Sequence, residues 1–386
     1  MQHADTPTST ASVAPAEPPR ASELLVHTET QGRVGFITLN RPQALNALTL
    51  AMIRALSAAL QAWRDDPMVL AVVVRGSGKD GPFGQFCAGG DIRFFHRAAQ
   101  TGDPTLEDFF TEEYRLNHLI HTYPKPYIAL MDGVVMGGGM GISQGASLRV
   151  VTPRTRMAMP ETGIGLFPDV GGGFFLSRCP GRVGEWLALT GQVLEAGDAV
   201  AFGLADGVLD AGRLPVLWAE LRSTPFESSN AVEHLVSTKL VAGNALFKSA
   251  KAKIDQYFCL NTVSDIVAAL EQSSTEFARQ TAAVLRTRSP LMLHVTLEHI
   301  RRARRMGLAD DLRMERDLVR HCFHATHLGR QGANSETVEG IRALAIDKDH
   351  APQWHPTRIE DVTPEMVNPF FESPWPPSVH PLANLG

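Results

Sequence analysis

The 386-residue sequence predicts a layered α/β fold whose last third is mostly helical. Three observations support this prediction. A strand-helix-strand pattern covers residues 34–76, strand-like runs and helical segments recur over residues 109–210, and strand patterns fade after about residue 225. Repeated strands and helices of this kind pack as a sheet with helices on its faces.

The first repeat begins at residues 34–39, VGFITL, which are rich in β-favouring side chains and predict a strand. A turn follows and ends at Thr49, whose hydroxyl is suited to cap a helix. The apolar residues then follow helical spacing at Met52, Ile53, Leu56, Ala59, Leu60 and Trp63. The run VLAVVVRG from residue 69 is apolar on both faces, which is typical of a fully buried parallel strand.

The same pattern is repeated in the middle of the chain. Strand-like segments occupy residues 127–133, 148–152, 156–161 and 207–210. Helical patterns occupy residues 109–121, 184–189 and 196–202. Later, amphipathic helical spacing covers residues 264–285 and 291–323.

The two ends of the chain have a different composition. The first 22 residues are rich in Ala, Pro, Ser and Thr and lack both the apolar segment of a secretory signal and the repeated Arg of a transit peptide. From residue 350 the chain is Pro-rich and contains Trp354 and Trp375, which predicts an extended tail held to the surface by aromatic rings. We therefore expect four parts: a disordered tail at 1–22, an α/β core at 23–224, a helical region at 225–349 and an extended tail at 350–386.

Composition excludes several classes of partner. The chain has 36 Lys+Arg against 41 Asp+Glu, 44% hydrophobic residues and 20% charged residues, which is the balance of a globular protein with a large core. The mildly acidic, interspersed charge does not fit a surface for nucleic acid or for an anionic membrane. No run approaches the roughly 20 apolar residues of a membrane-spanning helix. We expect neither a nucleic-acid nor a membrane partner.

The cysteines indicate the compartment. Four of them, Cys87, Cys179, Cys259 and Cys322, are scattered without a Cys-x-x-Cys spacing. This argues against a disulfide framework and against a thiolate zinc site. A reducing compartment fits best, so we predict a cytoplasmic location.

Three segments combine glycines with acidic residues: FCAGGDIR (86–93), DGVVMGGGMG (132–141) and MPETGIGLFPDVGGG (159–173). Glycine lets a backbone N–H approach a ligand closely, and two N–H groups from separate loops can form an oxyanion hole. Each segment alone is better explained as a tight turn, because glycine is common in turns.

Two acids lie in the third segment. Glu161 is surrounded in sequence by Met159, Ile164, Leu166 and Phe167, so its carboxyl is expected to be desolvated, with a raised pKa that suits proton transfer. Asp169 precedes a Gly-Gly-Gly turn, and from the residues alone its best role is to cap the N–H groups of that turn.

Taken together, the three segments resemble the crotonase (enoyl-CoA hydratase/isomerase) superfamily over about residues 23–210. The resemblance implies a crotonase-like α/β spiral of ββα units. It also implies that the N–H groups of Ala88 and Gly138 form the oxyanion hole for a thioester, and that Glu161 is the catalytic glutamate.

Within the superfamily, MPETGIGLFPDVGGGFFLSR and FFTEEYRLNHLI are similar to segments of the subfamily that hydrolyses 3-hydroxyisobutyryl-CoA. The C-terminal segments SPLMLHVTLEHIRRA, MERDLVRHC and VEGIRALAIDKDHAPQWHP agree, so the likeness covers nearly all of the chain beyond residue 22. It implies that Asp169 positions water or the substrate hydroxyl and that Glu113 hydrogen-bonds the 3-hydroxyl. Without the resemblance, Glu113 is a solvated charge on a helix. The expected activity is thioester hydrolysis in valine breakdown, with coenzyme A as part of the substrate and with no metal or other cofactor.

One position departs from the hydratases of the superfamily. They carry a second catalytic glutamate three residues after the oxyanion glycine, and here that position is Gly141. One glutamate, one aspartate and an oxyanion hole suit thioester cleavage, with Glu161 either activating water or attacking to form an acyl anhydride. The residues leave that choice open. An enoyl-CoA isomerase and a non-catalytic binder of acyl-CoA or protein stay as alternatives, and a homo-oligomer is compatible with each.

Two motifs point to other chemistry. Residues 141–145 match G-x-S-x-G, but the preceding GGGMG breaks the strand that a nucleophile elbow needs, so Ser143 is predicted to be a packing residue. Three histidines at three-residue steps, His321, His324 and His327, lack a further acid or Cys placed to complete a metal site. Lys79 and Arg93 are candidates for contact with the phosphates of coenzyme A.

Overall fold

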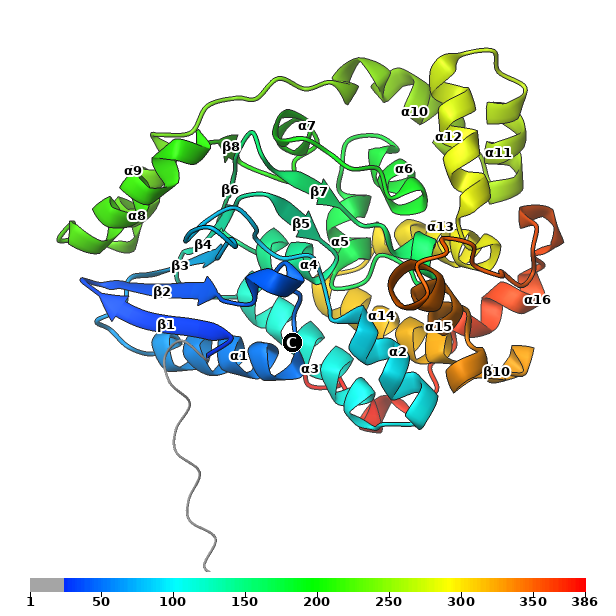
Figure 1. The fold of residues 1–386 in the computed structure, drawn as a ribbon, viewed down its shortest axis with the longest axis horizontal. Coiled ribbons are helices and arrows are strands. Elements are labelled where there is room, and N and C mark those ends of the chain that lie inside the picture. The colour runs from blue at the N-terminus through cyan, green and yellow to red at the C-terminus, as the bar shows by residue number, and fades with distance from the viewer. Residues whose placement is uncertain (1–23) are drawn as a thin grey trace, which may run out of the picture.

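The computed structural model describes residues 24–386, so the tail predicted at 1–22 lies outside the described residues. A six-stranded sheet runs through the molecule in the order β1-β2-β3-β4-β6-β8 (Figure 1). Its strands are β1 (Val26–Gln31), β2 (Val34–Leu39), β3 (Ala71–Gly76), β4 (Tyr127–Met131), β6 (Leu148–Val151) and β8 (Gly207–Val208). The first pair is antiparallel and all later pairs are parallel.

A second, smaller sheet gives the fold its repeat. Strands β5 (Val134–Met136) and β7 (Arg156–Ala158) pair in parallel, and an isolated parallel bridge joins Cys87 to Val135. Each repeat therefore has one strand of the large sheet, one short strand or bridge of the small sheet, and then a helix. The helices that follow the three short segments are α2 (Ile92–Thr101), α4 (Gly138–Gln144) and, after a turn, α5 (Gly172–Ser177).

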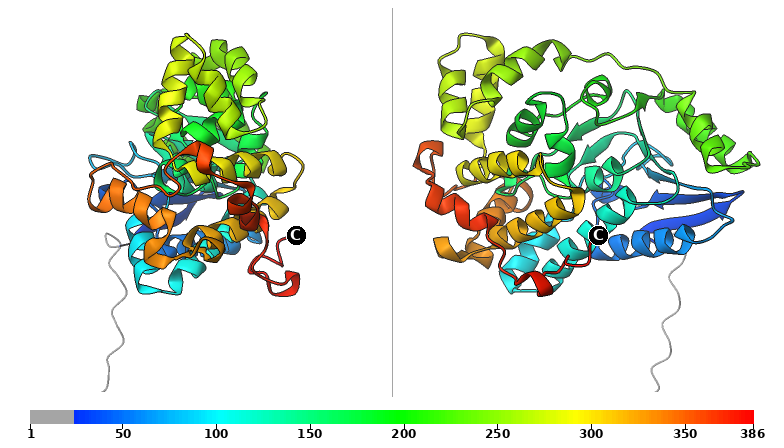
Figure 2. Two further views of the ribbon diagram at one scale, coloured as in Figure 1. Left: turned by 90° about the vertical axis from the view of Figure 1, so that its right-hand side faces the viewer. Right: turned by 180° about the vertical axis from the view of Figure 1, so that it is seen from behind.

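Both faces of the large sheet are covered, which explains why its central strands are mostly apolar. One face packs against α8 (Leu214–Ser223) and α9 (Ser229–Ser237), with Trp218 lying edge-on to Phe36 at 4.7 Å between ring centroids. On the other face, α1 (Leu50–Arg64) packs along α3 (Thr105–His121). The two views in Figure 2 show these layers from the side and from behind.

The predicted first unit is confirmed. Residues 34–39 form β2, and the Thr49 hydroxyl accepts a hydrogen bond from the Met52 N–H at the start of α1. Two elements of this part of the chain were not predicted. Strand β1 is mostly exposed and carries no apolar alternation, and α2 follows directly on a glycine-rich loop.

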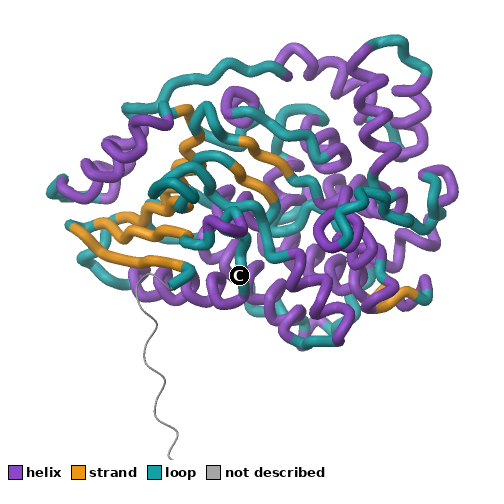
Figure 3. Tube along the Cα trace, viewed as in Figure 1, coloured by secondary structure: helices purple, strands orange, loops and turns teal. Residues whose placement is uncertain are grey.

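The C-terminal part is mostly helical, as the tube in Figure 3 shows. Its helices and those that precede it are α6 (Val183–Thr190), α7 (Ala196–Ala201), α10 (Lys251–Phe258), α11 (Val263–Glu271), α12 (Glu276–Thr287), α13 (Pro290–Ala303), α14 (Leu308–Phe323), α15 (Glu336–Ile341) and α16 (Pro364–Val367). A small hairpin is formed by β9 (His324–Ala325) and β10 (Arg330–Gln331). Each of the two long helical spans predicted after residue 260 is two helices, because Thr275 caps a new helix and a turn at 304–307 breaks the second span.

The C-terminal helices pack on the core rather than apart from it. Helix α13 contacts α5 and α6, α14 contacts α3, and α15 contacts α2. The segment from residue 350 contains short helical turns as well as extended backbone, and Trp354 in it is buried. The predicted boundaries at residues 225 and 350 stay predictions. Among residues 24–386, no helix has both the length and the apolar character that crossing a membrane requires.

Candidate active site

The three glycine-rich segments meet at one edge of the small sheet. Cys87, β5 and β7 lie side by side and run in parallel, so the residues after them leave the sheet at the same end. The residues that leave the sheet at this end are 88–90, 137–138 and 160–161. Parallel pairing therefore brings together loops that are far apart in the chain.

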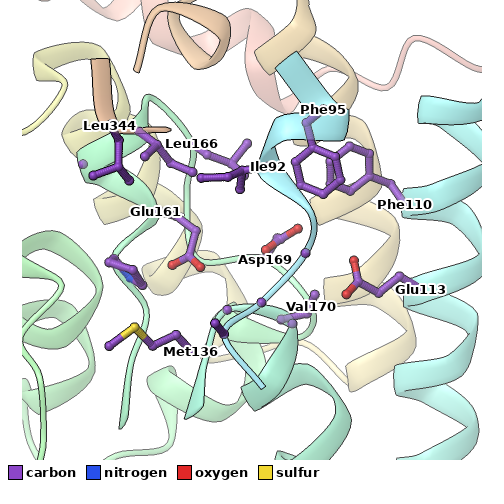
Figure 4. Close-up of a pocket in the computed structure, with 18 of the residues that line it drawn as sticks. Ile92, Phe95, Phe110, Glu113, Met136, Glu161, Leu166, Asp169, Val170 and Leu344 are labelled. Atoms are coloured by element: carbon purple, nitrogen blue, oxygen red, sulfur yellow. The ribbon is translucent and has the colours of Figure 1, made fainter. Parts of the chain in front are cut away.

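These loops line a cavity of about 320 Å³. Figure 4 shows Glu161, Asp169 and Glu113 around it, with Phe95 and Phe110 together on one side and Leu344 on the other. Its lining also includes Gly90, Ile92, Met136, Gly138, Arg288 and Val170. Arg288 and Leu344 come from the C-terminal region, so both parts of the chain build the cavity.

Glu161 lies in the turn after β7, where only 6% of the residue is exposed. Its Oε2 has no hydrogen-bond partner within the described residues. Burial, and then the charge of Asp169, hold the pKa of Glu161 well above its usual value. The sequence-based expectation of a desolvated carboxyl agrees with this environment.

Asp169 faces the same cavity and is equally buried. The Tyr114 hydroxyl donates a hydrogen bond to its Oδ2 at 2.8 Å. Burial raises the pKa of Asp169 to about 6, and the Tyr114 hydrogen bond opposes that rise because it stabilises the ionised form. Asp169 is therefore largely ionised at neutral pH.

Glu113 projects from α3 into the cavity and is only 2% exposed, so it is not a solvated helix charge. Its Oε1 has no hydrogen-bond partner in the described part of the chain. Burial, and the charges of Asp169 and Glu161, hold its pKa well above the usual value. An unpaired buried carboxyl that faces a cavity is suited to bind a polar group of a ligand.

Two consecutive glycines separate the two glutamates. A Cβ on Gly137 would lie 2.8 Å from Oε1 of Glu161, and a Cβ on Gly138 would lie 2.5 Å from Oε1 of Glu113. Gly137 also has a φ of 47°, a conformation that residues with a Cβ rarely adopt. Position 137 therefore favours glycine because of its backbone conformation, a Cβ at either position would crowd a glutamate carboxyl, and the backbone lies within reach of both carboxyls.

The N–H of Gly138 is free to bind a ligand. Gly138 is the first residue of α4, where the helix itself supplies no acceptor, and no other acceptor for this N–H occurs within residues 24–386. Gly138 lines the cavity. The geometry thus agrees with its predicted place in an oxyanion hole.

Ala88 does not have a free N–H, and the prediction that it supplies the second amide is wrong. Its N–H donates to the Leu45 carbonyl at 3.0 Å. Two residues further along, Gly90 pairs with Leu48 in a parallel bridge. In this bridge the Leu48 N–H donates to the Gly89 carbonyl, and the Leu48 carbonyl accepts from the Asp91 N–H. The Gly90 N–H points away from Leu48 in such a bridge, and the described residues provide no acceptor for it. Gly90 is the better candidate.

Gly141 lies behind the cavity wall. A Cβ there would lie 2.6 Å from the Cβ of Val170 and 2.9 Å from Nδ2 of Asn117. No second glutamate fits at this position without displacing the residue next to Asp169.

Replacing Gly141 by Ala is expected to lower the free energy of unfolding by about 1–3 kcal/mol, because the added methyl overpacks the contact with Val170. Urea denaturation measures the change. Gly81→Ala is the matched control, since a Cβ at Gly81 has open space around it. Equal stability of the two variants would contradict the packing described here.

The residues of the two other motifs have structural partners. The Ser143 hydroxyl is fully buried and donates to the Gly139 carbonyl at 2.8 Å, as expected of a packing residue. His321 and His327 hydrogen-bond the carbonyls of Glu372 and Met366 through Nε2. Lys79 and Arg93 are exposed and do not line the cavity, so their contact with coenzyme A stays a prediction.

Tyr114 was missed by sequence reasoning, although it directly follows Glu113 in the chain. Tyr114→Phe removes the hydroxyl that donates to Asp169, and the loss of this hydrogen bond destabilises the ionised carboxyl and raises its pKa. If ionised Asp169 is needed for activity, kcat/KM rises at about pH 6 in the wild type. In the variant we expect this rise, the acid limb of the profile, about one pH unit higher. Tyr123→Phe is the control, since its hydroxyl bonds the Leu60 carbonyl away from the cavity. An unmoved limb in Tyr114→Phe would show that Asp169 does not govern it.

A family model described as enoyl-CoA hydratase/isomerase matches residues 34–371. The chain belongs to this family. Among curated members, the 3-hydroxyisobutyryl-CoA hydrolase, mitochondrial, of Rattus norvegicus is 40% identical over 362 residues, which is 90% of this chain and 90% of that protein. The Gallus gallus protein of the same name is 38% identical over 350 residues, covering 89% and 88% of the two chains.

Two solved structures of this enoyl-CoA hydratase/isomerase family have the same fold, which confirms the expected crotonase-like architecture. A carnitinyl-CoA dehydratase from Mycobacterium thermoresistibile is 36% identical with a TM-score of 0.81, covering 90% of this chain and 96% of that one. An enoyl-CoA hydratase from Rhodobacter sphaeroides 2.4.1 is also 36% identical with a TM-score of 0.81, covering 91% and 98%. The names of these two proteins and of the curated relatives thus indicate different reactions.

Proposed function

We propose that the protein hydrolyses the thioester of 3-hydroxyisobutyryl-CoA, or of a similar short 3-hydroxyacyl-CoA, to the free acid and coenzyme A. Curated relatives of that name at 37–40% identity over about nine-tenths of the chain support this substrate. The observation that carries the proposal is one cavity that joins two free backbone amides to three buried carboxyl groups.

In this proposal the thioester oxygen accepts hydrogen bonds from the N–H groups of Gly138 and Gly90. Negative charge grows on that oxygen when water attacks the carbonyl carbon, and fixed donors in a site shielded from water stabilise it strongly. The glycines at 137 and 138 let the carbonyl approach the amides between the two glutamates. The oxyanion hole is thus built from backbone, as the resemblance implied, with Gly90 in place of Ala88.

Glu161 acts on the attacking water or attacks the carbonyl itself. As a base, its carboxylate takes one proton from water while the oxygen adds to the carbonyl carbon. The tetrahedral intermediate then collapses, the C–S bond breaks and the proton passes to the leaving sulfur. As a nucleophile, the Glu161 carboxylate attacks the carbonyl carbon, and the C–S bond breaks to give an acyl anhydride and the thiolate of coenzyme A. Water then adds to the anhydride and breaks its C–O bond, which releases the free acid and the Glu161 carboxylate, and the remaining proton passes to the thiolate. A raised pKa makes the ionised Glu161 a strong base in either route.

Asp169 and Glu113 orient the reactants in the same proposal. Asp169, held by Tyr114, accepts a hydrogen bond from the attacking water or from the substrate hydroxyl. Glu113 has an unpaired Oε1 at the Gly138 side of the cavity, where it binds the 3-hydroxyl. These roles account for a hydroxylated acyl group as the preferred substrate.

Hydration of an enoyl-CoA is the rival reaction, because the two similar solved structures are of proteins named as a dehydratase and a hydratase. The second glutamate that hydratases of the family place three residues after the oxyanion glycine is absent, and Gly141 has no room for it. The site therefore favours hydrolysis.

Release of free thiol from 3-hydroxyisobutyryl-CoA, followed together with the absorbance of any enoyl thioester formed, tests the proposal. We expect stoichiometric thiol and acid with no enoyl product. An enoyl product without thiol would assign the hydratase reaction, isomerisation of an added enoyl-CoA would assign the isomerase, and no turnover would leave a binding protein. Each of these three results overturns the proposal.

The wider setting belongs to the same proposal. A hydrolase of this kind takes part in valine catabolism, uses coenzyme A as part of its substrate and needs no metal or other cofactor. The names of the curated relatives place those proteins in mitochondria. For this chain we propose the cytoplasm, supported by its four free cysteines.

A further inference from the structure

A cluster of three fully buried titratable side chains lies outside the cavity. His299 comes from α13, and Asp311 and Glu315 come from α14, and each is 0% exposed. The Nε2 atom of His299 is 3.3 Å from Oδ1 of Asp311 and 3.3 Å from Oε1 of Glu315. We call these three residues the clamp.

The clamp holds the turn that follows Asp169. Glu315 accepts hydrogen bonds from the N–H groups of Gly171, at 2.7 Å, and Gly173, at 3.0 Å. Asp311 accepts one from the Phe174 N–H at 2.6 Å. These are the N–H groups at the start of α5 that the helix cannot satisfy by itself, and they begin two residues after Asp169.

The held turn has an unfavourable backbone conformation. Val170 has a φ of 57° and Gly171 a φ of 84°, both in the left-handed region. A β-branched residue such as valine is strongly disfavoured there and keeps such a conformation only where the surroundings impose it. The backbone hydrogen bonds to Glu315 and Asp311 supply that constraint directly beside Asp169.

His299 offsets negative charge on the carboxyls of the clamp, where burial, and then the charge of Asp311, raise the pKa of Glu315 to about 8. Burial alone lowers the pKa of His299, but the hydrogen bonds and charges of Asp311 and Glu315 outweigh burial and raise it to about 9. The other charged or titratable groups that bear on the clamp are Arg178 directly after α5, Tyr114 of α3, Glu161 and Asp169 itself. The positive charge of His299 also lowers the pKa of Asp169.

The clamp does not have the features of a metal site. One donor atom from each residue lies within 4.8 Å of the others, as metal ligands would. However, all four carboxylate oxygens already face a backbone N–H or the His299 ring, and the Gly173 backbone packs directly against His299 and Asp311. The carboxylates serve the α5 turn instead.

We propose that Glu315, Asp311 and His299 position Asp169 for catalysis by fixing the turn at residues 170–174. The C-terminal helices thus contribute to the reaction without touching the substrate, through the loop that carries one of its carboxyl groups. The inference rests on the proposed function. The clamp residues are positioning residues, because they act through Asp169.

His299→Gln tests the proposal, since glutamine removes the positive charge and keeps much of the volume. We expect kcat to fall about tenfold, KM to stay within about twofold, and the acid limb of kcat/KM to move to higher pH because Asp169 loses a nearby cation. Asp311→Asn serves as a second variant if His299→Gln fails to fold. His294→Gln on the same helix is the control, because its Nε2 bonds the Ile359 carbonyl away from the turn.

Two further readouts separate positioning from plain stability. Folding raises the pKa of His299 from 6.5 to about 9, so protonated His299 adds to the free energy of unfolding. This contribution is full below about pH 6.5 and is lost as the pH rises through about 9. The wild type has this contribution, and His299→Gln does not. Faster amide hydrogen exchange at Gly171, Gly173 and Phe174 in the variant shows a loosened turn without relying on activity. Thiol release by the wild type reports on the proposed function alone. A variant with an unmoved acid limb and unchanged exchange would overturn the clamp, even if it were less stable.

Discussion

Glu161→Gln is expected to reduce thiol release from 3-hydroxyisobutyryl-CoA by about a thousandfold. Glutamine has nearly the same shape as glutamate but can neither take a proton from water nor attack a carbonyl at a useful rate. The side chain is buried and Oε2 has no partner among the described residues, so the amide replaces the carboxyl without breaking a hydrogen bond to Oε2. The measurement is kcat for thiol release with saturating substrate.

The control for this prediction is the folded state of the variant. Because Glu161 is a buried carboxyl with a raised pKa, replacing it with a neutral amide is expected to leave the protein as stable as the wild type or more so. Glu276→Gln, at an exposed position, controls for a general loss of acid groups. Activity within tenfold of the wild type in a stable Glu161→Gln protein would mean that another group is the base.

Asp169→Asn is expected to lower kcat by about a hundredfold or more and to remove the acid limb near pH 6. The neutral amide still bonds to the Tyr114 hydroxyl but cannot hold the attacking water as a hydrogen-bond acceptor with negative charge. Measurement of kcat/KM from pH 5 to pH 9 gives the result. The wild-type rate should rise with pH as both Asp169 and Glu161 ionise, and the variant should lose the step near pH 6 that belongs to Asp169 and keep only the rise set by Glu161.

Comparison with Tyr114→Phe makes this prediction sharper. Asp169→Asn removes the step that belongs to Asp169, whereas Tyr114→Phe only moves that step upward, since Asp169 is still present but loses one hydrogen bond. A step near pH 6 that survives in Asp169→Asn would show that a different group, such as Glu161 or Glu113, titrates there.

From the sequence, we predicted correctly which loops form the site, but not which backbone N–H groups of those loops are free. Glycine patterns and one desolvated acid pointed to segments 86–93, 132–141 and 159–173, which do meet around one cavity. The error at Ala88 has a physical reason. Which amide of a loop is free depends on its pairing with Leu45 and Leu48, and no local pattern in FCAGGDIR specifies that pairing.

The contributions of distant segments were also beyond local patterns. Arg288, just after α12, and Leu344, in a segment whose likeness to the subfamily says nothing of its position, both reach the cavity. His299 and Glu315 meet only because α13 and α14 both pack on α5. On a helix, a buried acid and an exposed acid look alike in sequence until the packing partner is known. Tyr114 was closer to being found, since it adjoins Glu113.

The most direct test is a crystal structure of the Glu161→Gln protein with 3-hydroxyisobutyryl-CoA bound. We predict the thioester oxygen about 3 Å from the backbone nitrogens of both Gly138 and Gly90, and the 3-hydroxyl within hydrogen-bond distance of Glu113. A thioester bound elsewhere, or an oxygen that contacts neither amide, would contradict the account.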